Sequence, residues 1–167
     1  MEAEKVYIPK MDAVYKAASV LNRVVKLTNL DENHRLSKQY GANISFKRED
    51  LQVVRSYKIR GAYNKISSFA PSDLKAGVVC ASAGNHAQGV ALSCNRLGVM
   101  ATIFMPVTTP KQKLDQVRQF GGAYVDIELV GDTFDDAKSA ALAFAKSNAS
   151  VFIPPFDDEK ICSTSVD

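Results

Sequence analysis

The fold is decided by residues 77–98, which read GVVCASAGNHAQGVALSCNRLG. Gly77–Ala81 is a short apolar run that predicts a buried strand, and Asn85–Leu97 predicts a helix that ends at Gly98. The small residues Ser82–Gly84 between them predict a tight turn whose backbone a ligand can approach closely. A strand that leads through such a turn into a helix is typical of α/β proteins.

The same alternation continues toward the C-terminus. Strands are expected at 101–105, 123–130 and 151–153, and helices at 111–120 and 133–147, with Thr133 or Asp132 as the cap of the last helix. Strands and helices that alternate with short connections predict an α/β fold in which helices cover a parallel sheet. Before residue 77 we expect helices at 11–27, 31–40 and 58–69 and a short strand at 44–47.

Ligands of such sheets bind beyond the carboxyl ends of the strands, which is where Ser82–Gly89 is expected to lie. The helix that starts there has free N–H groups, so the turn predicts a site for a carboxylate or phosphate. The alternative is a plain glycine turn in which Asn85 caps the helix.

Lys58 is the candidate nucleophile of the chain. It stands in Ser56-Tyr57-Lys58-Ile59-Arg60-Gly61 at the start of a predicted helix, where the positive end of the helix dipole disfavours an ammonium group. A neutral lysine amine can form a Schiff base with an aldehyde. The alternative is a solvated helix lysine, which is the commoner state of this residue type.

Composition excludes several other classes of function. The 167 residues are 46% hydrophobic and 23% charged, which is ordinary for a soluble globular protein. The 21 basic residues are scattered, so no nucleic-acid partner is expected, and no apolar run approaches the roughly 18 residues of a membrane span. Cys80, Cys94 and Cys162 lack the spacing of a metal site, so no metal ion is expected. The N-terminus carries no targeting signal, so we expect a cytoplasmic protein. In that compartment the three thiols should be reduced.

With both motifs in view, the chain resembles the threonine dehydratases (threonine deaminases), pyridoxal-phosphate enzymes of fold type II. The resemblance rests on stretches in matching order, namely 46–52, 56–63, 81–91, 105–113, 120–122 and 154–158. It implies a tryptophan-synthase-β-like α/β fold and pyridoxal 5′-phosphate as the cofactor. It also implies β-elimination of water from L-threonine or L-serine and hydrolysis of the product, which gives 2-oxobutanoate or pyruvate plus ammonia.

The resemblance assigns roles to single residues. Lys58 corresponds to the lysine that binds the cofactor covalently and acts as general base, Tyr57 to an aromatic residue beside the cofactor, and Asn85 to the partner of its 3′-oxygen. The loop that holds the substrate carboxylate corresponds to Ser82, Gly84, Asn85, His86 and Ala87. Lys47–Asp50 are interpreted as a solvated charge run at the end of a strand.

Ala83 helps to choose within the family. The related serine racemases carry a second serine at this place, which serves as the acid and base on the opposite face of the substrate. Alanine cannot transfer a proton, so the resemblance favours elimination over racemisation. Nothing in the sequence decides between threonine and serine as the substrate.

The chain matches the N-terminal part of such an enzyme. Family members continue beyond residue 158 into the glycine-rich loop that grips the cofactor phosphate, whereas residues 161–167 depart from the family pattern. We expect residues 1–55 to belong to a larger, truncated domain with uncovered apolar faces. Residues 56–153 should form a small α/β domain, and residues 154–167 the start of the return to the larger one.

Two functions from different classes follow from this sequence. The first is a dehydratase of amino-acid metabolism. In the biosynthetic members of the family this reaction serves isoleucine formation, and the resemblance also implies a homo-oligomer. The second is a catalytically inactive piece that acts as an interaction or assembly module. A serine racemase-like enzyme is the weaker alternative.

Overall fold

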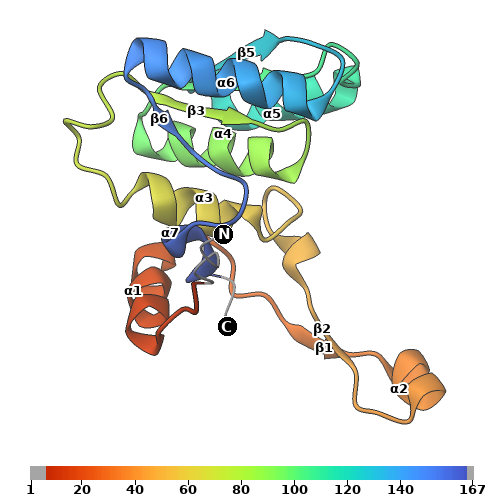
Figure 1. Cartoon of the computed structure of the whole chain (residues 1–167). Coiled ribbons are helices and arrows are strands. Elements are labelled where there is room, and N and C mark those ends of the chain that lie inside the picture. Colours follow the sequence, from red (N-terminus) through yellow and green to blue (C-terminus); the bar gives the residue numbers. More distant parts are fainter. Residues whose placement is uncertain (1–6, 165–167) are drawn as a thin grey trace, which may run out of the picture.

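The computed structural model describes residues 7–164 and contains a parallel four-stranded sheet, which confirms the α/β prediction (Figure 1). The strands lie in the order β5-β4-β3-β6, and each neighbouring pair is parallel. Their carboxyl ends therefore share one edge of the sheet. The bounds are Val78–Ala81 (β3), Ala101–Met105 (β4), Val125–Leu129 (β5) and Val151–Phe152 (β6).

Helices cover both faces of this sheet (Figure 1). α4 (Asn85–Leu97) and α5 (Lys111–Gly121) pack on one face, with the short 3-10 helix η2 (Gly122–Tyr124) after α5. α6 (Phe134–Asn148) covers the other face. α3 (Lys58–Ile66) packs against α4 and forms a further layer on that side.

Alternate residues of the strands build two separate cores. Val78 and Cys80 belong to the cluster formed with α3, α4 and α5, whereas Val79 and Ala81 pack against α6 residues such as Ala141. This follows from the two-residue period of a strand, which points successive side chains to opposite faces. Both faces of the central strands β3 and β4 are covered, so these two read as largely apolar runs, whereas the edge strand β5 alternates apolar and acidic residues.

α6 begins with a capping box. The Thr133 hydroxyl accepts a hydrogen bond from the backbone N–H of Asp136, whose carboxylate accepts one from the backbone N–H of Thr133 at 3.0 Å. Two free donors of the first turn are thereby satisfied. Of the two caps that the sequence allowed, Thr133 is the one that the structure uses.

The N-terminal residues form α1 (Met11–Leu21) and an extended arm, which projects from the body in Figure 1. The arm contains the antiparallel strands β1 (Leu30–Glu32) and β2 (Ser45–Lys47), with α2 (His34–Tyr40) between them. The short 3-10 helix η1 (Glu49–Leu51) leads back toward α3.

Two predicted helix bounds were wrong in this part. Asp31 and Glu32 were expected in a helix but pair with β2, because Asn33 caps α2 and accepts a hydrogen bond from Leu36 N–H at 2.9 Å. α1 ends at Leu21 rather than residue 27, since Arg23 adopts a left-handed φ of 65° that a helix cannot contain.

The last described residues return to α3. Asp158 caps the short α7 (Glu159–Cys162) and forms an ion pair with Lys65 of α3 at 2.7 Å. Asn64 Nδ2 donates to the Lys160 carbonyl at 2.7 Å. The approach is so close that a Cβ at Gly61 would lie 2.9 Å from Ile161. The described part of the chain contains no helix with the length and hydropathy needed to cross a bilayer.

Candidate active site

Lys58 is the first residue of α3 and lies against the first turns of α4. Gly89 of α4 makes this approach possible, because a Cβ at that position would lie 2.9 Å from the Lys58 carbonyl oxygen. Main-chain atoms cannot move aside as a flexible side chain can. The glycine therefore fixes how closely the lysine backbone meets the helix that follows β3.

The Lys58 amine lies at the carboxyl edge of the sheet. Its Nζ donates a hydrogen bond to the Pro155 carbonyl at 2.6 Å. Phe152 pairs with Val79 of β3, so Pro155 lies just beyond the carboxyl end of β6, and Lys58 lines the same small cavity as His86, which follows the turn after β3. The lysine and the predicted ligand turn therefore meet at the same edge, 24 residues apart in sequence.

Tyr57 lies beside this amine on the solvent side. The Lys58 Nζ is 5.1 Å from the centroid of the Tyr57 ring, which allows a cation–π contact. Half of Tyr57 is exposed, so an aromatic face remains open next to the lysine.

The turn after β3 presents its backbone to open space. Ser82 Oγ accepts a hydrogen bond from Gly84 N–H at 3.1 Å, and a Cβ added at Gly84 would meet no atom within 4 Å. Asn85 is exposed and begins α4, a helix of 13 residues whose first N–H groups have no acceptor within the helix. The helix dipole adds positive potential there, so the turn suits an anion.

The side chain of His86 points away from this open face and into the protein. It is 4% exposed, and Nε2 lies 3.0 Å from the Ile153 carbonyl oxygen, so Nε2 is assigned as the protonated ring nitrogen. Burial lowers the pKa of His86 to about 4, the hydrogen bond to Ile153 opposes this shift, and the charge of Lys58 adds to it. The ring is therefore neutral near pH 7.

The predicted site residues thus divide into two groups. Tyr57, Lys58 and His86 line one small cavity of about 10 Å³ with Gly61, Ala62, Pro155, Ile161 and Thr164. Ser82, Gly84 and Asn85 form the open turn beside it, whereas the Ala87 side chain is buried in the core. Sequence reasoning did not find the carbonyls of Ile153 and Pro155, although the Pro154-Pro155 pair marked a stiff segment at this edge.

A polar network lies behind α3. Arg60 Nε donates to Glu49 Oε2 at 2.8 Å, and Thr28 Oγ1 donates to Glu49 Oε1 at 2.6 Å. Burial raises the pKa of Glu49, but the hydrogen bonds from Arg60 and Thr28 outweigh it and lower the pKa to about 2. The prediction of a solvated charge run was therefore wrong for Glu49.

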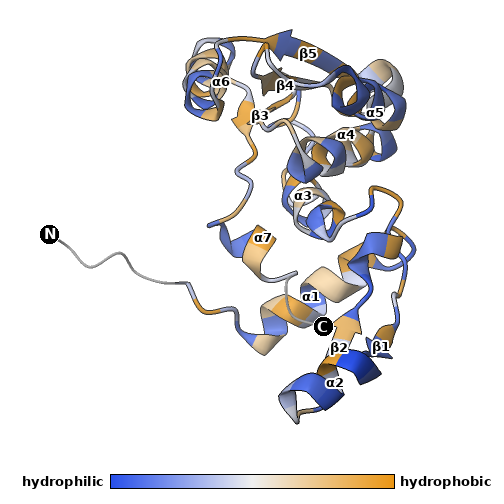
Figure 2. Ribbon diagram, turned by 90° about the vertical axis from the view of Figure 1, so that its right-hand side faces the viewer, coloured by the Kyte–Doolittle hydropathy of each residue, from blue (hydrophilic) through white to orange (hydrophobic). Residues whose placement is uncertain are grey.

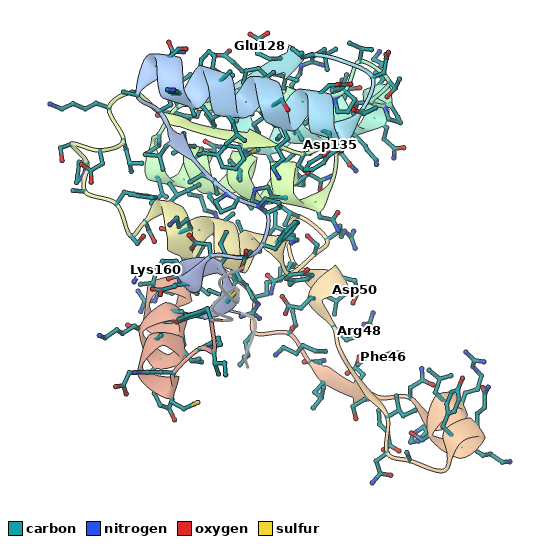
Figure 3. The ribbon with its side chains drawn as sticks, viewed as in Figure 1. Phe46, Arg48, Asp50, Glu128, Asp135 and Lys160 are labelled. Atoms are coloured by element: carbon teal, nitrogen blue, oxygen red, sulfur yellow. The ribbon has the colours of Figure 1, made fainter. Side chains whose placement is uncertain are left out.

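The neighbouring charges do fit that prediction. Arg48 and Asp50 lie on the segment between the arm and the body, where both side chains are open to solvent (Figure 3). Their ion pair of 2.9 Å joins groups that are 36% and 58% exposed. Glu49 differs from these neighbours because η1 turns its side chain toward α3.

A lysine amine beside a helix N-terminus, at the carboxyl edge of a parallel sheet, is suited to an enzyme whose cofactor has an aldehyde and an anionic group. Comparison with known families agrees with this class. The chain belongs to the pyridoxal-phosphate dependent enzyme family, whose model matches residues 21–165.

Within this family the chain is similar to threonine dehydratases. It is 52% identical over 152 residues to the biosynthetic L-threonine dehydratase of Halalkalibacterium halodurans, which covers 91% of this chain and 37% of that protein. The corresponding enzyme of Bacillus subtilis is 52% identical over 148 residues, or 89% of this chain and 35% of the relative. The chain thus spans little more than a third of the length of the curated relatives it matches.

Solved structures agree in fold. The processed form of threonine deaminase isoform 2 from Solanum lycopersicum is 40% identical, with a TM-score of 0.80 over 96% of this chain and 48% of that chain. Maize serine racemase is 26% identical, with a TM-score of 0.86 over 95% of this chain and 47% of that chain. The described structure therefore corresponds to about half of these enzymes.

The described residues suit pyridoxal phosphate in part. Lys58 has an amine that could react with its aldehyde, Tyr57 lies beside that amine and is half exposed, and Asn85 is exposed at the start of α4. The cavity of about 10 Å³ behind Lys58 has room for no more than about one water molecule. A pyridine ring therefore does not fit inside this cavity.

Proposed function

We propose that this chain is part of a pyridoxal-phosphate-dependent dehydratase that acts on L-threonine or L-serine. The single observation that carries the proposal is the small cavity that Lys58, with Nζ at the Pro155 carbonyl, lines together with His86, which follows the turn after β3. The candidate nucleophile Lys58 thus lies beside the turn after β3, which is the candidate site for a carboxylate. The similarity to threonine dehydratases supports the choice of substrate class.

The cofactor, when bound, supplies an aldehyde for amines and a ring that withdraws electrons from the substrate Cα. Lys58 would hold the cofactor through Nζ, with Tyr57 beside the ring and Asn85 near its 3′-oxygen. Once free, the Lys58 Nζ is placed to take the proton from Cα as a general base. Release of the β-hydroxyl and hydrolysis then lead to a 2-oxo acid and ammonia.

The turn after β3 would hold the substrate carboxylate. The open backbone at Gly84 and the first N–H groups of α4 give it donors, and Ser82 adds a hydroxyl. We assign the same role to the backbone of His86 and Ala87, whose side chains are buried. A carboxylate held there orients the rest of the amino acid toward Lys58.

The test uses a chimera, because the chain spans only part of its relatives. The matching 148 residues of the Bacillus subtilis enzyme are replaced by this sequence, and 2-oxobutanoate is measured with L-threonine and pyruvate with L-serine. We expect the chimera to form 2-oxobutanoate. Lys58→Ala should lower the rate by roughly 10³-fold, because the general base is lost.

Lys75→Ala is the matched control, since Lys75 is an exposed lysine outside the site. In the isolated 167-residue chain, pyridoxal phosphate should give an absorbance at the blue edge of the visible that Lys58→Ala removes and Lys75→Ala retains. A chimera that turns over threonine equally well with Lys58→Ala would contradict the proposal.

A second candidate function is a non-catalytic assembly module. Large apolar side chains of the N-terminal part are exposed, among them Leu27 at 93%, Leu30 at 68% and Phe46 at 45%. Such a surface suits contact with another protein segment. An isolated chain that fails to gain absorbance with pyridoxal phosphate, yet restores activity to the remaining part of the relative, would favour this function.

We further propose that the enzyme eliminates water rather than racemises serine, because Ala83 has no group that transfers a proton. Formation of D-serine from L-serine by the chimera would contradict this.

We also propose a cytoplasmic location. The thiols of Cys80, Cys94 and Cys162 are all free, which supports a reducing compartment.

A further inference from the structure

Two side chains at the small cavity are held by one short segment of main chain. His86 Nε2 donates to the Ile153 carbonyl at 3.0 Å, and Lys58 Nζ donates to the Pro155 carbonyl at 2.6 Å. The two carbonyls are separated by Pro154. Proline fixes φ and has no N–H, so the Pro154-Pro155 pair makes this segment stiff. A change in the position of the first carbonyl is therefore transmitted to the second.

The first carbonyl is anchored from two directions. The Ile153 N–H donates to the Val79 carbonyl at 2.8 Å, which joins the residue to β3, and its side chain is fully buried. His86 then fixes the carbonyl oxygen of the same residue. The buried ring is the one polar side chain for which the structure gives a hydrogen bond to Ile153.

α4 also fixes the backbone of the lysine. Gly89 stands three residues after His86, so both face the same side of the helix. At Gly89 the Lys58 main chain touches α4, and at His86 the same helix reaches the segment that binds the amine. α4 thus contacts the Lys58 main chain directly and, through His86, also binds the segment whose carbonyl accepts a hydrogen bond from the Lys58 amine.

We propose that the imidazole of His86 is a positioning residue for Lys58. By donating from Nε2 to the Ile153 carbonyl, it fixes the Ile153–Pro155 segment, and the Pro155 carbonyl then orients the Lys58 amine. This role rests on the proposed function, in which an oriented amine attacks an aldehyde and accepts a proton. It differs from the role at the substrate carboxylate, which the backbone of His86 can fill.

The neutral state of the ring fits this role. Burial lowers the pKa of His86 to about 4, so the ring remains a neutral donor near pH 7. An imidazolium would place a second positive charge beside the amine. His86→Gln keeps a neutral donor at similar reach, whereas His86→Leu keeps apolar volume and removes the donor.

The first test measures by NMR whether the Lys58 amine is fixed, in the absence of any aldehyde. In the 167-residue chain, a fixed amine makes the two Hε protons of Lys58 inequivalent by NMR, and Lys58→Arg identifies their signals. We expect two resolved signals in the wild type and in His86→Gln, and one averaged signal in His86→Leu. His34→Leu is the matched control, because the His34 side chain is 87% exposed on α2.

The second test measures the dissociation constant of pyridoxal phosphate from its absorbance change. Loss of the His86 hydrogen bond should raise this constant about tenfold in His86→Leu, with little change in His86→Gln or His34→Leu. If His86→Gln behaves like His86→Leu in both tests, the ring acts through its packing and the proposal fails. Two resolved Lys58 signals in folded His86→Leu would also overturn it.

A further variant covers the case in which His86→Leu does not fold. Changing Pro154 and Pro155 together to alanine keeps both carbonyls but removes the stiffness between them. We expect the Lys58 signals to average in this variant, and unchanged signals would contradict the proposal. If the signals respond as expected but pyridoxal phosphate never binds, the proposed function fails while the positioning role of His86 stands.

Discussion

The body of the molecule, residues 54–153, and the N-terminal part, residues 7–53, are held by different forces. The body contains two apolar cores on the two faces of a parallel sheet. Among the described residues 7–53, Ala17 and Leu21 are the hydrophobic side chains that are buried. Figure 2 marks apolar residues on α1, β2 and β3; Met11 of α1 and Phe46 of β2 are exposed, whereas all residues of β3 are buried.

Polar contacts join the N-terminal part to the body. Arg60 of α3 donates two hydrogen bonds to the Glu49 carboxylate, at 2.8 and 2.9 Å, and Arg96 of α4 donates to the Val24 carbonyl. Such contacts depend on direction and fix a segment without removing much apolar surface from water. The comparison shows that apolar burial stabilises the body, whereas directional polar contacts fix the position of the N-terminal part. We propose that residues 56–153 are the unit that can fold alone.

The largest effect that tests this comparison is a cavity in the body. Ile103 is fully buried in β4, so Ile103→Ala should lower the free energy of unfolding by about 3–4 kcal/mol. Leu27→Ala removes an equally large side chain that is 93% exposed in the N-terminal part, and it should change stability by less than about 0.5 kcal/mol. Urea denaturation of both variants measures the difference. Equal losses would mean that the N-terminal part has a core of its own.

Acid should weaken the two regions in different pH windows. Folding lowers the pKa of His86 from 6.5 to about 4, so the unfolded chain binds this proton more readily. Its contribution is complete above pH 6.5 and is lost as the pH falls toward 4, a change on the order of 3 kcal/mol. Folding lowers the pKa of Glu49 from 4.5 to about 2, so its contribution to the free energy of unfolding is lost as the pH falls from 4.5 toward 2.

The free energy of unfolding as a function of pH tests these windows. His86→Leu should flatten the curve in the upper window, and Glu49→Gln should flatten it in the lower one. A His86→Leu curve that runs parallel to the wild type through the upper window would show that the body does not sense acid through this ring.

The smallest effect concerns the junction between the two regions. Glu49→Gln removes the carboxylate that pairs with the buried Arg60 at 2.8 Å and should cost about 2 kcal/mol. Asp50→Asn, one residue along the chain, breaks a pair that is 36% and 58% exposed and should change stability much less, because solvent screens the pair. Thermal denaturation compares the two. If both variants lose the same stability, the Glu49 network does not join the regions as described.

Local patterns predicted the body well because its elements repeat with strict periods. All four strands and the helices α4, α5 and α6 lie where the apolar periodicity placed them, within two residues at each end. The N-terminal part was predicted less well. Asp31 and Glu32 have helix-compatible neighbours, and their pairing with β2 depends on a hairpin that closes over 12 intervening residues.

The candidate site shows the same division. Lys58 and the turn from Ser82 were predicted as site residues because each has a local signal, a helix start or a cluster of small residues. The Pro155 carbonyl carries no signal in the sequence, since every residue has one. The inward turn of His86 also depends on β6 lying beside β3.

The sequence by itself determined the order of the elements, the family and the two motifs, because these depend on periods and spacings within short windows. The tertiary structure alone decided which atoms meet. It brought the Lys58 amine to a carbonyl 97 residues away, turned Glu49 toward Arg60 and left the arm uncovered. Contacts of this kind depend on how strands pair and helices pack over long separations, and no local pattern specifies them.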